Sequence, residues 1–313
     1  MTSVIPEAVT AAVATAASDE RADAILVIEG VSKTYAKGPV ALDNVSLSIK
    51  PGLFGLLGPN GAGKSTLMRT LATLQQPSRG SVRFEGVDVV ASPETVRRSL
   101  GYLPQDFGVY PRISAYRLLD HLAILKGLTD KAQRRDEVEA LLHKTNLYAD
   151  RKRSVSTFSG GMRQRFGIAQ ALLGDPKLVI VDEPTAGLDP AERNRFHTLL
   201  AELSRDKVIL LSTHIVDDVE ELCAEVAILV RGRVTRAGRP AALVDALRGK
   251  LWCRRVPRAD LDAIAEDPRH IATRLSAGEP VVRMVADEAP GDGYEPAAPD
   301  LEDVYFHTLK TAQ

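Results

Sequence analysis

The sequence has few cysteines and no long apolar run. Its 313 residues include only Cys223 and Cys253, and neither belongs to a paired spacing. A disulfide framework or a cysteine-based metal site is therefore not expected, and a reducing compartment is the simpler interpretation. No stretch approaches the roughly 18 consecutive apolar residues that a membrane-spanning helix needs, so we expect no such helix.

An excess of charge of either sign is also missing. The formal net charge is -1, so no overall basic field points to nucleic acid and no acidic excess points to disorder. Hydrophobic residues make up 44% of the chain and charged residues 26%, as in globular proteins with a sizeable core. The length allows two or three compact units, or one large α/β domain with an appendage.

Residues 1–24 lack the basic start of a secretory signal, and Glu7, Asp19 and Glu20 interrupt their Ala-, Thr- and Val-rich pattern. We expect a flexible N-terminal leader here, with a short surface helix as the alternative. Farther along, residues 238–313 differ in composition from the rest. They contain weak strand patterns at 250–256 and 280–284, a Pro- and Gly-rich linker at 289–299 and an amphipathic stretch at 301–309.

Between these regions, apolar runs of strand length alternate with segments of helical periodicity. Strands are expected at 24–29, 40–49, 53–57, 178–181 and 207–212, with a hairpin at 81–90. Helices are expected at 64–74, 164–173 and 192–203 and from Val216, and helical periodicity runs through 92–157, clearest at 116–126 and 136–142. This alternation predicts an α/β fold with a mainly parallel sheet and helices on both of its faces.

A glycine-rich loop follows the third expected strand. Residues 58–66 read GPNGAGKST and fit the pattern GxxxxGK[ST] between a strand and a helix. Glycines let the backbone wrap an anion closely with its N–H groups pointing inward, and the helix N-terminus adds its positive dipole end. We expect Lys64 to reach the β- and γ-phosphates of a nucleotide and Ser65 to bind Mg²⁺.

Two carboxylates follow the buried strand at 178–181. Ligands of open parallel sheets bind at the carboxyl ends of strands, so Asp182 and Glu183 are expected to lie beside the phosphates. Asp182 suits Mg²⁺ and Glu183 suits polarising the attacking water. Taken alone, such a pair is more often a solvated turn or a helix cap.

The segment 158–165, FSGGMRQR, closely resembles the signature of the ABC ATPases, usually written LSGGQ, with Phe158 in place of Leu and Met162 in place of the final Gln. Physically, Ser159, Gly160 and Gly161 form a second anion cradle before a helix. Because one chain has one terminal phosphate to bind, a second cradle favours a dimer with nucleotide between the cradles. The alternative is a helix capped by Ser159 and followed by a glycine hinge.

Four more positions resemble this family in the family's order along the chain. The resemblance implies that Tyr35 stacks on adenine, that Gln105 senses Mg²⁺ and the γ-phosphate, that Asp189 lies in the D-loop and that His214 is the switch histidine. From residue type alone, Tyr35 is more often a core or rim residue, and Asp189 before Pro190 is a helix cap.

The resemblance covers about residues 25–237. It implies an ATPase core with an antiparallel β subdomain, a helical subdomain at about 92–165 and a small C-terminal α+β appendage at 238–313. The implied activity is ATP hydrolysis with Mg²⁺ as the cofactor, carried out by Glu183, His214, Gln105 and Lys64. The expected Mg²⁺ ligands are Ser65, Gln105 and Asp182. The residues expected to bind ATP are Tyr35, Gly58, Asn60, Gly61, Ala62, Gly63, Lys64, Ser65, Thr66, Gln105, Ser159, Gly160, Gly161 and Asp189.

The implied partners are a second ATPase subunit and a separate transmembrane permease at the cytoplasmic face of the membrane. In the family, the segment 106–111 lies near the permease, although Phe107 and Tyr110 by residue type are more often core residues. Segment 299–305 is similar to the closing segment of bacterial exporter ATPases whose permeases are separate chains.

The alternative is a soluble ABC ATPase that acts on nucleic acid or ribosomes. Such relatives usually have two cassettes, a coiled-coil insertion or zinc-binding cysteines, and this sequence shows none of these. We therefore expect no nucleic acid as a partner. A P-loop kinase or GTPase would not explain Ser159 or His214.

Overall fold

The computed structural model describes residues 25–36, 38–105, 107–108 and 112–312. Its central sheet has six strands in the order β10-β9-β3-β8-β7-β6. The strands are β3 (Gly52–Leu57), β6 (Leu100–Leu103), β7 (Leu178–Asp182), β8 (Val208–Thr213), β9 (Glu225–Val230) and β10 (Arg233–Gly238). All neighbours pair in parallel except β10, which is antiparallel to β9. The predicted mainly parallel sheet is therefore present.

Side chains of the central strands alternate between two hydrophobic cores, because successive residues of a strand face opposite sides. Val179 and Val181 of β7 belong to one core, while Leu178 and Ile180 belong to the other. Both faces are thus buried, which explains why these strands appear in the sequence as continuous apolar runs.

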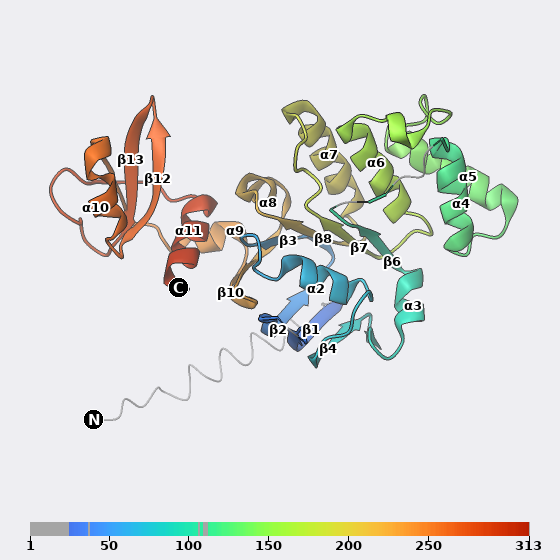
Figure 1. Cartoon of the computed structure of the whole chain (residues 1–313), viewed down its shortest axis with the longest axis horizontal. Coiled ribbons are helices and arrows are strands. Elements are labelled where there is room, and N and C mark those ends of the chain that lie inside the picture. The colour runs from blue at the N-terminus through green and yellow to red at the C-terminus, as the bar shows by residue number, and fades with distance from the viewer. Residues whose placement is uncertain (1–24, 37, 106, 109–111, 313) are drawn as a thin grey trace.

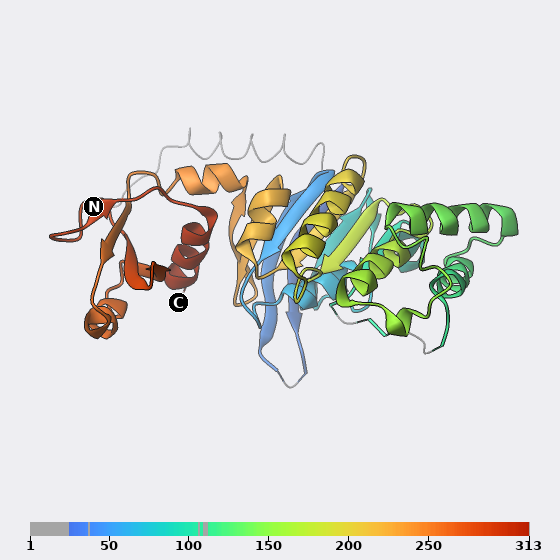
Figure 2. The same ribbon diagram turned by 90° about the horizontal axis from the view of Figure 1, so that it is seen from above.

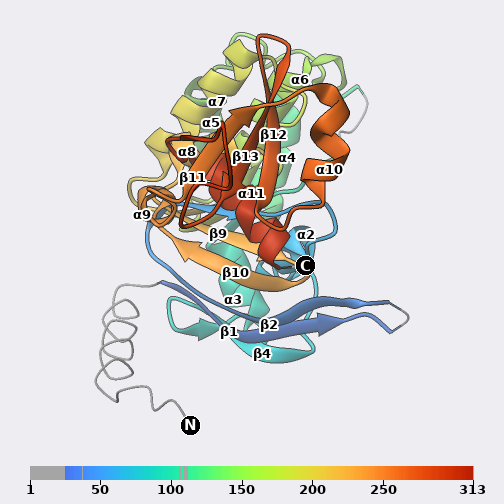
Figure 3. The ribbon, with the colours of Figure 1, turned by 90° about the vertical axis from the view of Figure 1, so that its left-hand side faces the viewer.

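One face of the central sheet packs against α2 (Lys64–Leu71) and a four-stranded sheet in the order β2-β1-β4-β5. The strands of this sheet are β1 (Leu26–Thr34), β2 (Val40–Ile49), β4 (Arg79–Phe84) and β5 (Val87–Asp88). Adjacent strands are antiparallel, and Figure 3 shows them below the central sheet. The predicted strand at 40–49 matches β2.

The other face packs against a layer of helices. These are α4 (Ala115–Leu125), α5 (Lys131–Lys144), α6 (Gly160–Ala171), α7 (Pro190–Leu203) and α8 (Val216–Leu222). Helices α4 and α5 lie at one end of the elongated molecule (Figures 1 and 2). None of the helices in the described part of the chain is both long and apolar enough to cross a membrane.

The helical periodicity expected throughout 92–157 is wrong at one place. After α3 (Pro93–Arg98), residues 100–103 form β6, which pairs with β7 at the edge of the central sheet. A four-residue apolar run has no period of its own, and its pairing partner lies more than 70 residues away in the sequence. Strands β9 and β10 were not predicted either.

The C-terminal region contains a third sheet, in the order β12-β13-β11-β14. Its elements are α9 (Pro240–Asp245), β11 (Leu251–Arg255), α10 (Leu261–Ala265), β12 (His270–Ser276), β13 (Glu279–Val285), β14 (Glu295–Pro296) and α11 (Leu301–Thr311). The sheet lies at the end of the molecule opposite to α5 (Figures 1 and 2). Helix α11 returns from it, and Leu301, Val304 and Tyr305 join the same core as Val219 of α8.

Candidate functional site

The phosphate-binding pattern forms the loop between the carboxyl end of β3 and the start of α2. Gly63, the residue before α2, has a φ of 106°, and a Cβ atom there would lie 2.4 Å from the carbonyl oxygen of Ala41. Only glycine suits both the backbone angle and the space. The loop borders a cavity of about 330 Å³, whose lining residues are Ala41, Pro59, Asn60, Gly61, Gly63, Lys64, Ser65, Thr66, Gln105 and Glu183.

The ammonium group of Lys64 lies inside this loop. The side chain is only 5% exposed, and Nζ lies 3.5 Å from Oε1 of Glu183. Nζ also donates hydrogen bonds to the carbonyl oxygens of Gly58 (2.6 Å) and Pro59 (3.3 Å). A nearly buried cation held at the start of a helix is the arrangement expected for binding phosphate oxygens.

Glu183 is the centre of a cluster of polar side chains. Its Oε2 lies 3.2 Å from Nδ1 of His214 and accepts a hydrogen bond from Nε2 of Gln105 at 3.4 Å. With Lys64 on its other oxygen, Glu183 contacts all three of the remaining residues expected to be catalytic. Glu183 and these three residues come from four segments that follow parallel strands, so the sheet brings them together at the carboxyl ends of its strands. A carboxylate so placed can orient a water molecule for attack.

Asp182, the last residue of β7, is 4% exposed, and its Oδ1 is buried without a hydrogen-bond partner. Burial raises the pKa of Asp182, and the nearby hydroxyl groups of Ser212 and Ser65 offset part of this rise. A buried carboxylate oxygen that lacks a partner, beside the Ser65 hydroxyl, fits a divalent cation because such ions prefer hard oxygen ligands.

The ABC transporter family model matches residues 42–186. The doxorubicin resistance ATP-binding protein DrrA of Mycobacterium tuberculosis is 39% identical over 276 residues, which cover 85% of this chain and 83% of DrrA. The chain belongs to the ABC transporter family. The Nod factor export ATP-binding protein I of Rhizobium meliloti is 33% identical over 89% of this chain and 86% of its own length.

Solved structures of ABC ATPases share the fold. The cbiO1 protein of Clostridium perfringens, part of the ABC transporter complex cbiONQ, is 29% identical with a TM-score of 0.65, covering 71% of this chain and 90% of cbiO1. The ATP-binding cassette MJ0796, dimeric and bound to ADP and Pi in a post-hydrolysis state, is 27% identical with a TM-score of 0.63, covering 68% and 98%. The predicted fold class is confirmed, and the chain is an ATP-binding ATPase subunit.

The signature segment of this ABC ATPase lies apart from the cavity. Ser159 caps α6, accepting a hydrogen bond from the Met162 backbone N–H at 3.2 Å, and both Ser159 and Gly160 are exposed. Gly161 packs so closely on Glu192 that a Cβ atom would lie 2.5 Å from its carboxylate oxygen. None of the signature residues lines the cavity of its own chain.

The two departures from the usual signature face the protein interior. Phe158 is 6% exposed and makes an edge contact with Phe166, at 6.3 Å between ring centroids. Met162 is partly buried against the same core. Both substitutions therefore leave the exposed Ser159 and Gly160 unchanged.

Asp189, Tyr35 and Ala62 were also predicted as site residues. Asp189 caps α7, accepting a hydrogen bond from the Glu192 backbone N–H at 2.9 Å. The hydroxyl of Tyr35 lies 3.4 Å from Oγ1 of Thr66 and donates a hydrogen bond to Oε1 of Gln75 at 3.0 Å. The residue is 42% exposed. The side chain of Ala62, 3% exposed, faces the core and leaves only its backbone for a ligand.

The segment that follows Gln105 is partly described. Phe107 packs against the helical core, and a Cβ atom on Gly167 would lie 2.9 Å from its ring. The core-packing alternative therefore holds for Phe107. Tyr110 lies outside the described residues.

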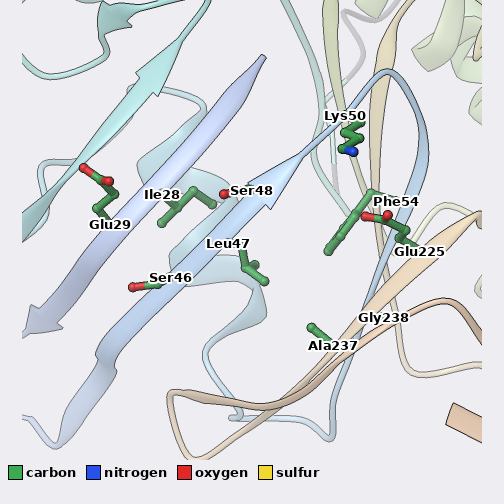
Figure 4. Close-up of a pocket in the computed structure, with 10 residues that line it drawn as sticks. All are labelled: Ile28, Glu29, Ser46, Leu47, Ser48, Lys50, Phe54, Glu225, Ala237 and Gly238. Carbon is green, nitrogen blue, oxygen red and sulfur yellow. The ribbon is translucent and has the colours of Figure 1, made fainter. Parts of the chain in front are cut away.

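A second cavity, of about 310 Å³, lies between the antiparallel and central sheets. In Figure 4, Ile28 and Leu47 line one side, and Phe54 and Glu225, at the starts of β3 and β9, line the other. Ligands of parallel sheets bind at the carboxyl ends of strands. This cavity is at the opposite ends of β3 and β9, so we assign it no part in nucleotide binding.

Sequence reasoning did not find Ala41. It lines the phosphate cavity from the start of β2, and its carbonyl oxygen excludes a side chain at Gly63. Alanine carries no chemical signal of its own. The only hint was the glycine that it makes necessary.

Proposed function

We propose that two copies of this chain hydrolyse two ATP molecules at shared sites and drive export through a separate transmembrane permease. The observation that carries the proposal is the separation of two cradles. Lys64, Gln105 and Glu183 line one cavity, and His214 contacts Glu183. Ser159 of the same chain does not line this cavity and lies at the exposed start of α6.

The residues would act mainly by positioning and charge neutralisation, since phosphoryl transfer needs little covalent chemistry from the protein. The loop residues and Lys64 hold the phosphates, Glu183 orients the attacking water, and Gln105 and His214 contact the terminal phosphate. We place Mg²⁺ at Ser65, Gln105 and Asp182, where it would neutralise charge on the β- and γ-phosphates.

In the dimer, the serine and glycines of one signature would bind the terminal phosphate held by the other chain. The exposure of Ser159 and Gly160 leaves this cradle free for a partner. The dimeric structure of MJ0796, bound to ADP and Pi, supports such pairing in a related cassette. The shared terminal phosphate would hold the dimer closed, and its release after hydrolysis would let the dimer reopen.

Transport through a separate permease, from a position at the cytoplasmic face of the membrane, rests on the names of the relatives. DrrA is an ATP-binding protein of doxorubicin resistance, and the rhizobial protein is an ATP-binding protein of Nod factor export. We place the ATPase domain at 25–237, including a helical subdomain at about 92–165, and a C-terminal accessory domain at 238–313.

A basic cavity supports permease contact at the helical subdomain. It has a volume of about 620 Å³, and its charged lining residues are Arg112, Arg117, Arg151 and Lys152. No carboxylate lines it among the described residues. The cavity begins next to the segment that lies near the permease in this family, and its charge would suit an acidic permease segment.

The test is ATP-driven dimerisation of the hydrolysis-deficient variant. We expect Glu183→Gln to bind Mg·ATP, hydrolyse it at least ~100-fold more slowly than wild type and form a stable dimer in light scattering. Adding Ser159→Arg should abolish that dimer, because the arginine side chain is much larger than serine and would block the second cradle.

Ser159→Arg alone serves as the control and should still bind ATP as a monomer. Near-normal turnover by Glu183→Gln would remove Glu183 from its role. A nucleotide-driven dimer that survives Ser159→Arg would contradict the shared site.

A further inference from the structure

A fully buried carboxylate connects the elements around the hydrolysis site. Asp218 of α8 has no exposed surface. Its Oδ2 accepts hydrogen bonds from Oγ1 of Thr185 at 2.5 Å and of Thr213 at 3.5 Å. Its Oδ1 accepts from Nε of Arg193 at 2.7 Å and lies 2.8 Å from Nε2 of His197. Four side chains from three separate segments thus meet on one carboxylate.

The two threonines lie beside the residues proposed to handle water and phosphate. Thr185 is two residues after Glu183, and Thr213 directly precedes His214. Glu183 and His214 are themselves only 3.2 Å apart. Asp218 therefore connects, through a short hydroxyl link to Thr185 and a longer one to Thr213, the two backbone segments that must hold this pair together.

The backbone of Glu183 needs such support. Its φ is +48°, in the left-handed region that residues with a side chain rarely adopt. Such a conformation persists only where the surrounding structure holds it in place. One stabilising contact is the hydrogen bond from the Glu183 N–H to the carbonyl oxygen of Ser212, at 2.8 Å. The hydrogen bond from Thr185 to Asp218 is a second stabilising contact.

The third connection reaches α7, which Asp189, the residue expected in the D-loop, caps. Arg193 and His197 lie one and two turns into α7, and both contact Asp218. His197 is 6% exposed, and its Nδ1 lies 2.9 Å from Oε2 of Glu221, also on α8. Movement of the D-loop helix is thereby tied to the segment that holds Glu183.

We propose that Asp218 is a positioning residue for ATP hydrolysis, which holds Glu183 and His214 in register with each other and with the D-loop helix. The inference rests on the proposed roles of Glu183 and His214. It adds Asp218, Thr185 and Thr213 to the hydrolysis machinery as residues that act without touching ATP.

The test is steady-state kinetics of Asp218→Asn beside nucleotide-binding measurements with ATP. We expect kcat to fall about 100-fold, because small displacements of reacting groups cost rates of that order, while KM and ATP affinity stay near wild type. Thr185→Val should lower kcat in the same direction, and Thr185→Ser, which restores the hydroxyl, should recover it. The Thr185 pair keeps the inference testable if Asp218→Asn folds poorly.

Two controls separate positioning from general stability. Asp303 is equally buried and also paired with arginine, through Nη2 of Arg283 at 2.5 Å, but it lies in the C-terminal region. Asp303→Asn should lower the melting temperature and leave kcat unchanged. In addition, Asp218→Asn should not slow Glu183→Gln any further, since both changes would remove the same contribution.

Equal kcat losses in Asp218→Asn and Asp303→Asn, or additive losses with Glu183→Gln, would overturn the inference. Normal turnover by Asp218→Asn beside an inactive Glu183→Gln would overturn this inference alone. Near-normal turnover by Glu183→Gln would overturn the proposed function together with it.

Discussion

At the scale of single residues, backbone contacts decide which side chains the phosphate site tolerates. Gly63 combines a left-handed φ with a carbonyl oxygen 2.4 Å from the position of its missing Cβ. Glu183 adopts a left-handed φ despite its side chain. The first position needs glycine, whereas the second needs a neighbourhood that holds an unfavourable conformation.

Tyr35 offers a test at this scale. We expect Tyr35→Ala to weaken ATP binding about tenfold, because one base–aromatic stack contributes on that order. Tyr35→Phe should bind ATP as wild type, since stacking needs the ring and not the hydroxyl that contacts Gln75. Titration with a fluorescent ATP analogue measures both. Equal losses in the two variants would assign Tyr35 to the hydrogen bond instead of the base.

The sequence allowed most candidate site residues to be named because their chemistry demands fixed residue types. A phosphate loop needs glycines and a lysine, and the water needs a carboxylate such as Glu183. Ala41 and Asp218 could not be named in this way. Their importance comes from contacts with residues distant in the sequence, which local pattern does not encode.

At the scale of elements, strands with their own period were predictable and strands defined by pairing were not. The alternation at 40–49 and the apolar run of β7 matched the structure closely. β6 was missed because its four residues lie within a helical pattern and become a strand only beside β7. β12, missed likewise, has an irregular pairing with β13.

The start of α11 is an element-scale anchor with a defined pH dependence. Asp300 caps the helix, and Arg274 donates to its two carboxylate oxygens at 2.6 and 2.8 Å. Burial raises the pKa of Asp300, but Arg274 and the Asp303 backbone N–H outweigh burial and hold the pKa at about 2. The stabilisation is therefore present above the ordinary pKa of about 3.9 and is lost as pH falls toward 2.

We expect Asp300→Asn to lower the urea midpoint near pH 6, and the difference from wild type to shrink toward about pH 3. Trp252, the single tryptophan, lies in β11 and reports this region by fluorescence. Asp267→Asn is the matched control. Arg269 also holds the pKa of Asp267 at about 2, but a partner two residues away can remain paired after unfolding. A difference independent of pH would contradict the role of the Asp300 charge.

At the scale of the whole molecule, helices α4 and α5 and the C-terminal sheet lie at opposite ends of the central sheet (Figure 2). The basic cavity lies at the start of α4, away from the C-terminal region. Because of this separation, substitutions at the proposed permease contact should not affect the C-terminal region 238–313, and substitutions there should not affect the contact.

Reversing the charge of the basic cavity tests the permease contact. We expect Arg117→Glu with Lys152→Glu to reduce co-purification with a multi-span membrane protein from detergent extracts at least about tenfold, because like charges across a contact repel. ATP-driven dimerisation should be unchanged. Arg135→Glu, on the neighbouring helix α5 and 60% exposed, is the control and should co-purify normally. If the double variant recovers as much of the membrane protein as wild type, the permease contact is not at this cavity.

Helix α11 also has a consequence for synthesis on the ribosome. Leu301, Val304 and Tyr305 join the same core as α8, the helix that follows His214, and α11 lies against α8. While the chain is being made, the side of α8 that α11 covers stays exposed for the time needed to add about 80 residues, some seconds at usual elongation speeds. The core of the ATPase domain is therefore incomplete until α11 has left the ribosome. Until then, the exposed side of α8 is a surface that a chaperone could bind.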